Sequence, residues 1–148
     1  MTGNPLINLG ELSKPATVLV EKISDAVGGV FKPYQIVRVA KAEAKAHQIE
    51  AESQLEITDL QHRALDRFVR EEAQKQQNME EITQLALPQV GEEAIPEDVE
   101  NDWITNFFDK CRLISDTEMQ GLWSRVLSGE ANKPGSYSKR TLNFLSSL

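Results

Sequence analysis

The sequence has little of what several common protein classes require. It contains a single cysteine, Cys111, which excludes an internal disulfide framework and a zinc site built from several cysteines. No apolar run approaches the roughly 20 residues that cross a bilayer. The first residues also lack the basic and apolar regions of a signal peptide. We therefore expect a cytoplasmic protein.

Aromatic and basic residues are also scarce. Aromatics make up 6% of the 148 residues, so we expect a mainly aliphatic core. There are 16 basic and 23 acidic residues, and the net charge of -7 argues against a nucleic-acid-binding protein. The acidity is densest over residues 92–102, which lack the glycine and ligand frame of a calcium loop. We interpret that run as an exposed linker followed by a helix start.

Turn-forming residues are missing from a long central stretch. Neither glycine nor proline occurs between Pro33 and Pro88, and the interior is rich in good helix formers. This predicts one very long helix over about 34–86, roughly 80 Å in length at 1.5 Å per residue. The alternative is a break in the polar stretch 74–78, with Asn78 capping a last short helix.

One side of this predicted helix carries small and apolar residues at helical spacing. Successive members are separated by 4, 3, 4, 4, 3, 4 and 4 residues: Ala42, Ala46, Ile49, Ser53, Ile57, Leu60, Ala64 and Phe68. This rhythm is close to an eleven-residue repeat, which favours a nearly straight helix pair over a tight left-handed coiled coil. We expect the stripe to form an interface with a copy of the chain or with another protein. The simpler alternative is a surface helix that packs against the short helices of its own chain.

The flanking segments predict helices as well, so the expected fold is all-α. Residues 1–32 contain an amphipathic helix over about 12–27, which Ser13 would cap and Gly28 would end. Residues 33–87 would be the long helix that serves as the assembly element, and residues 88–97 a linker. Residues 98–148 would form a small bundle of three short helices, in which Ser115 and Ser138 act as caps. Its expected core residues are Trp103, Phe107, Trp123 and Leu127.

No pattern typical of catalysis or cofactor binding occurs. His47 and His62 lie on the long charged segment without the paired Glu-x-x-His motifs of a di-metal helical bundle. There is no phosphate-binding glycine loop and no nucleophile elbow. Cys111 lies in an apolar stripe, where a buried, inert thiol is expected. We therefore expect no enzymatic activity, no cofactor and no metal.

Several short motifs are spread along the chain and are densest in its C-terminal part. They are Gly29, Lys32-Pro33, Ala40-Lys41-Ala42-Glu43-Ala44, Gln77-Asn78, Asp102-Trp103, Phe107-Phe108, Ser115-Asp116, Met119-Gln120, Trp123, Leu127, Gly129-Glu130, Pro134-Gly135-Ser136, Ser138 and Arg140-Thr141-Leu142. Together they resemble an uncharacterised bacterial domain-of-unknown-function family that is similar to the abortive-infection alpha proteins. The resemblance covers about residues 10–148 and is most specific in the C-terminal part. Members of that family usually continue further, and this chain ends on a core-type residue, Leu148. The resemblance thus implies a bacterial protein, sometimes associated with phage defence, whose C-terminal bundle is truncated here.

These observations lead to one expected function and one alternative. The first is a non-enzymatic helical assembly protein that contributes to anti-phage defence by forming oligomers or binding a partner. The alternative is a membrane-active abortive-infection effector that inserts its N-terminal amphipathic helix. Membrane binding is the weaker expectation because Glu21 and Asp25 lie on the polar face of that helix, where a membrane-surface helix carries basic residues.

Overall fold

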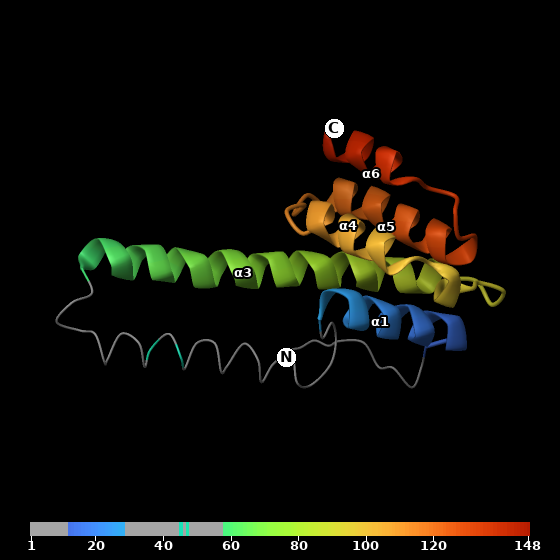
Figure 1. Cartoon of the computed structure of the whole chain (residues 1–148), viewed down its shortest axis with the longest axis horizontal. Helices are drawn as coiled ribbons and strands as arrows, with labels where there is room; N and C mark the ends of the chain where they lie inside the picture. The colour runs from blue at the N-terminus through green and yellow to red at the C-terminus, as the bar shows by residue number, and fades with distance from the viewer. Residues whose placement is uncertain (1–11, 29–44, 46, 48–57) are drawn as a thin grey trace.

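The computed structural model describes residues 12–28, 45, 47 and 58–148, and this part of the chain is built from α-helices without strands (Figure 1). The all-α prediction is therefore confirmed. The elements are α1 (Lys14–Val27), α3 (Asp59–Ala86), the 3₁₀ turns η2 (Leu87–Gln89) and η3 (Pro96–Asp98), α4 (Asn101–Cys111), α5 (Thr117–Asn132) and α6 (Lys139–Ser146).

The long helix α3 begins at Asp59, so the predicted start near residue 34 is wrong. Thr58 has an extended backbone, with φ -77° and ψ 162°, and caps the helix. Its hydroxyl accepts from the N–H of Gln61 at 3.2 Å, while the Gln61 side chain accepts from the Thr58 N–H at 2.8 Å. This reciprocal capping box satisfies two N–H groups of the first turn. The predicted C-terminal end agrees, since α3 ends at Ala86.

The alternative break near residues 74–78 is also wrong, because α3 runs through this polar stretch without interruption. Asn78 is only 2% exposed and caps no helix. Its side-chain amide instead donates to the main-chain carbonyl of Arg112, at the end of α4, at 2.8 Å. A polar residue that satisfies its hydrogen bonds across an interface can remain inside a helix.

The ends of the shorter helices follow local capping rules, with one difference from expectation. Ser13 caps α1 and Ser138 caps α6, as predicted. Gly28 ends α1 with φ 91°, a conformation that favours glycine. Helix α5 is capped by Asp116, whose carboxylate accepts from the Met119 N–H at 2.9 Å, and not by Ser115. The Ser115 hydroxyl donates to the side chain of Asn78 instead.

Helices α4, α5 and α6 lie over the C-terminal half of α3, and the N-terminal half of α3 extends beyond them (Figure 1). Helix α5 packs on α3, whereas α1 and α6 pack on α4. The aromatic centre of this core is Phe107, whose ring lies 5.3 Å from Trp103 and 5.4 Å from Trp123 between centroids. Trp103, Phe107, Trp123 and Leu127 are all buried.

The core also extends beyond the segment 98–148. Leu19, Val20 and Ile23 of α1 are at most 1% exposed, and Ile82 and Ala86 of α3 are fully buried in the same cluster. Helix α1 and the C-terminal half of α3 therefore belong to the same packed unit as the three short helices.

Candidate interaction surface

The N-terminal half of α3 exposes large apolar side chains to solvent. Leu60 is 67% exposed and Phe68 is 60% exposed, and Ala64 lies midway between them and is also exposed. Residues four apart on a helix lie on one side of it, so these three form a continuous strip. We call this strip the apolar face of α3.

The apolar face continues into the packed core along the same side of α3. Steps of three and four residues lead from Phe68 through Glu71 and Lys75 to Asn78, and then to Ile82 and Ala86. The last three residues are buried beneath the neighbouring helices. One side of α3 is therefore covered at its C-terminal end and open at its N-terminal end, and two charged residues separate the two parts.

The exposed half of α3 is covered with balanced charges. Residues 59–75 contain four acidic side chains and four basic ones, so the segment has no net charge while the whole chain carries -7. Arg63 lies 3.1 Å from Asp59, Arg67 lies 3.7 Å from Glu71, and Lys75 lies 3.3 Å from Glu72. Most of these side chains are more than half exposed, so each pair stabilises the helix only slightly.

Three of the eight residues predicted to form the interface can be placed on this surface. Leu60, Ala64 and Phe68 lie together on the apolar face. The other five lie outside the residues that the structure describes: Ala42, Ala46, Ile49, Ser53 and Ile57.

A polar network centred on Asn78 marks where the cover over α3 begins. The Asn78 amide group donates to the Arg112 carbonyl, and its side-chain oxygen accepts from Gln74 at 2.9 Å and from Ser115 at 3.2 Å. Arg112 and Ser115 belong to the loop between α4 and α5. This loop therefore fixes the edge of the bundle to one point on α3, ten residues from Phe68.

Further along, α5 presents a polar strip to α3 and to the η2 turn that follows it. The Gln120 amide donates to the Glu81 carboxylate of α3 at 3.0 Å. In η2, the Gln89 side chain donates to the Ser124 hydroxyl and accepts from the Ser128 hydroxyl, both at 3.3 Å. All three α5 residues are at most 4% exposed. This interface was not predicted from the sequence, although Gln120, Ser124 and Ser128 recur at four-residue spacing beside the apolar stripe of the same helix. Such a pattern indicates a polar helix–helix contact.

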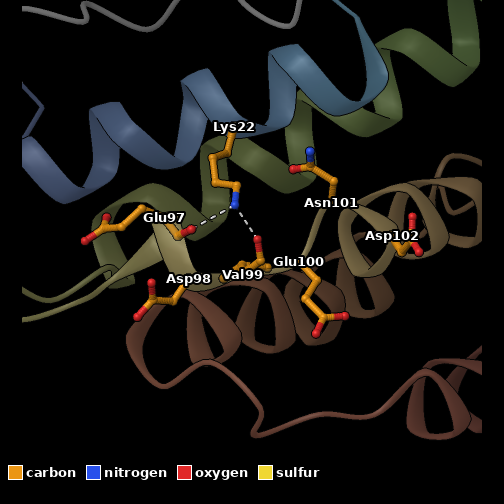
Figure 2. A pocket seen from close by; sticks show the side chains of 7 residues that line it. All are labelled: Lys22, Glu97, Asp98, Val99, Glu100, Asn101 and Asp102. Carbon is orange, nitrogen blue, oxygen red and sulfur yellow. Dashed lines mark hydrogen bonds between the residues drawn. The ribbon is translucent and has the colours of Figure 1, made fainter.

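A pocket of about 440 Å³ lies where α1 meets the acidic run before α4, and Lys22 reaches into it (Figure 2). The Lys22 ammonium donates to the main-chain carbonyls of Glu97, at 3.0 Å, and Val99. In Figure 2 the side chains of Glu97, Asp98 and Glu100 point in different directions, away from a common centre. A lysine of the chain itself therefore supplies the positive charge in this acidic region.

A second pocket, of about 420 Å³, lies beside the loop between α5 and α6. Glu130 is 4% exposed there, and its two carboxylate oxygens accept from the main-chain N–H groups of Gly135, at 2.8 Å, and Tyr137, at 2.9 Å. The Trp103 indole donates to the Tyr137 carbonyl at 2.9 Å. The buried carboxylate is thus engaged in holding the loop, which is a structural role.

The described residues show no arrangement typical of catalysis. Among residues 12–28, 45, 47 and 58–148, no group of three His, Cys, Asp or Glu side chains could hold a metal ion. Cys111 is fully buried, and this burial raises the pKa of its thiol well above the ordinary value. Such a thiol stays protonated near neutral pH and is a poor nucleophile.

In the same part of the chain, none of the helices has the length and apolar character needed to traverse a bilayer.

Comparison with known proteins gives one family match. The chain matches no curated protein and no solved structure. Residues 62–148, more than half of the chain, match the model of a family described as protein of unknown function DUF2806. The matched region contains most of α3, including Ala64 and Phe68, together with α4, α5 and α6. The chain therefore belongs to the DUF2806 family of proteins of unknown function.

Proposed function

We propose that this protein is a non-enzymatic assembly protein that binds a copy of itself or another protein through the apolar face of α3. The observation that carries the proposal is the exposure of Leu60 and Phe68 on a helix half that extends beyond the bundle (Figure 1). Full burial of one such side chain contributes roughly 1.5–3 kcal/mol. Covering both would therefore supply a substantial part of the free energy of a moderate protein–protein contact.

The proposed biological setting is bacterial defence against phage. It is supported by the resemblance of the sequence motifs to a family similar to the abortive-infection alpha proteins. In this setting the bundle would be the folded head of the protein and α3 the element that joins it to its partner.

The burial of α1 favours assembly over the alternative membrane-active effector. Its apolar residues Leu19, Val20 and Ile23 are packed in the core against α4, so α1 would have to leave the bundle before inserting into a lipid surface. The apolar face of α3, in contrast, is already accessible.

The double variant Leu60→Asp/Phe68→Asp tests the proposal. Both side chains are exposed, so helical circular dichroism and thermal stability should change little. Association should be lost, because each aspartate would place a charge in an apolar contact. Phe144→Asp is the matched control, because Phe144 is 65% exposed but lies on α6, which packs on α4.

Light scattering after size-exclusion chromatography would report self-association, and co-purification from the host would report a partner. The proposal predicts that the α3 double variant loses the complex while wild type and Phe144→Asp keep it. Plating of phage on cells that express each variant should show the same order of protection. Equal complex formation by all three proteins would contradict the proposed role of α3.

A further inference from the structure

We infer that the partner of the apolar face of α3 is the same face of a second copy, running antiparallel, with Ala64 on the two-fold axis. This inference rests on the proposed function and specifies the partner and its orientation. Three features of the described residues carry it: the spacing of the face, the position of the bundle along α3, and the local charge.

The apolar face is self-complementary when it is reversed. Leu60 and Phe68 lie four residues before and four residues after Ala64. In an antiparallel pair centred on Ala64, Leu60 of each copy meets Phe68 of the other, and the two alanines meet at the crossing. On each side of the central contact between the two alanines, a Leu60 side chain then packs against a Phe68 side chain. An interface made of one patch used twice is the usual form of a symmetric dimer.

The bundle position argues against the parallel arrangement. In a parallel pair, Asn78 of one copy would lie opposite Asn78 of the other, but this side of α3 is already covered by the loop that carries Arg112 and Ser115. An antiparallel partner helix instead passes the N-terminal end of α3, and its own bundle lies away from the first one. Among the described residues, the open and covered ends of the same helix side therefore favour the antiparallel direction.

The charge of the segment permits this approach. Residues 59–75 are neutral in sum, whereas each whole chain carries -7. Two copies carry net charges of the same sign and therefore repel each other on average, and α3 offers a region whose net charge is zero. The small size of the apolar face is typical of weak dimers, so we expect a dissociation constant on the order of micromolar.

Disulfide cross-linking of introduced cysteines tests the orientation. Wild type provides the background, because its only cysteine, Cys111, is buried. Ala64→Cys should cross-link to itself, since a disulfide needs Cα atoms about 4.4–6.8 Å apart. Leu60→Cys alone and Phe68→Cys alone should not, because equivalent atoms would be about 12 Å apart along the pair. When the Leu60→Cys and Phe68→Cys proteins carry different tags and are mixed, they should form a disulfide-linked dimer that contains both tags.

The pattern of products distinguishes the possible outcomes. Cross-links at 64–64 and 60–68, with a mass that rises toward twice 16.6 kDa at high concentration, are expected. Cross-links of 60–60 and 68–68 without the mixed product would mean a parallel pair and would overturn the inference. No cross-linking with any variant would also overturn it. Suppose that no variant cross-links but that wild type binds a different protein and the Leu60→Asp/Phe68→Asp variant does not. The proposed function would then stand, and only pairing with a second copy would be wrong.

Discussion

At the residue scale, Gly129 shows how closely the loop after α5 packs on that helix. A Cβ atom added at Gly129 would lie 2.8 Å from the Cε2 atom and 3.2 Å from the hydroxyl oxygen of Tyr137. Tyr137 is also held by hydrogen bonds to Glu130 and Trp103. These bonds hold the main chain of Tyr137, so its half-buried ring must turn or shift to make room for an added methyl group.

We predict that Gly129→Ala destabilises the protein by roughly 1–3 kcal/mol, because the added methyl group overpacks the contact with Tyr137. Gly121→Ala is the control in the same helix, since its nearest neighbour would be an arginine nitrogen at an ordinary 3.9 Å. Alanine there should stabilise by roughly 0.5–1 kcal/mol through helix propensity. Thermal unfolding followed by circular dichroism measures both, and equal effects at the two glycines would contradict the packing argument.

At the element scale, α3 depends on polar contacts as well as on apolar burial. Asn78 is the residue at which the α4–α5 loop is attached: its side chain forms hydrogen bonds with Arg112 and Ser115 of that loop, and a third with Gln74 on its own helix. Removing its side chain would take the donor from the partly buried Arg112 carbonyl.

We predict that Asn78→Ala lowers the free energy of unfolding by roughly 1–3 kcal/mol, the cost of leaving a buried polar group unsatisfied. Gln77→Ala is the matched control, because Gln77 is exposed and its side chain bonds only to Glu81 on the same helix. The control should change stability by less than about 0.5 kcal/mol. Denaturant unfolding would compare them, and a similar loss in both variants would refute the anchoring role.

Helix positions were largely predictable, and helix–helix contacts were not. The periodic apolar residues of α1, α4, α5 and α6 and the caps Ser13 and Ser138 are local signals, and the structure agrees with them. The start of α3 lies at a capping box formed by Thr58 and Gln61, so the absence of glycine and proline over residues 34–86 does not guarantee one continuous helix. The roles of Asn78 and Ser115 depend on residues 34 and 37 positions away, which no local pattern contains.

The candidate surface was predictable only in part. The spacing of Leu60, Ala64 and Phe68 identified one helix side, but sequence could not show which part of that side the bundle leaves open. The same stripe is exposed at Phe68 and buried at Ile82, and the packing of α5 and of the α4–α5 loop on α3 makes the difference.

At the scale of the whole molecule, α1 is part of the domain although it lies outside the family match. The match begins at residue 62, yet Leu19 and Ile23 are fully buried in the core that contains Phe107 and Trp123. Lys22 adds a polar attachment to the segment before α4. The folding unit is therefore larger than the region that matches the family, residues 62–148.

We predict that Leu19→Ala destabilises the whole unit by roughly 2–5 kcal/mol, the usual cost of a cavity in a core. Helical circular dichroism and the fluorescence of Trp103 and Trp123 should lose signal together, with one shifted midpoint. Glu21→Ala, an exposed change on the same helix, should leave that midpoint within about 0.5 kcal/mol of wild type. If the tryptophan transition stayed at the wild-type midpoint after Leu19→Ala, α1 would be an independent appendage.

The uninterrupted course of α3 has a mechanical consequence. Its 28 residues span about 42 Å, and only the C-terminal part is fastened to the bundle. Helix α3 is thus a lever arm whose pivot lies near Asn78. A small rotation of α3 near Asn78 displaces Leu60 by a larger distance, because Leu60 lies far from this point along the helix. The rigidity of the contacts around Asn78 therefore determines how precisely Leu60 is positioned. Conversely, a partner that binds the N-terminal end of α3 and moves it would exert a force on the packing around Asn78.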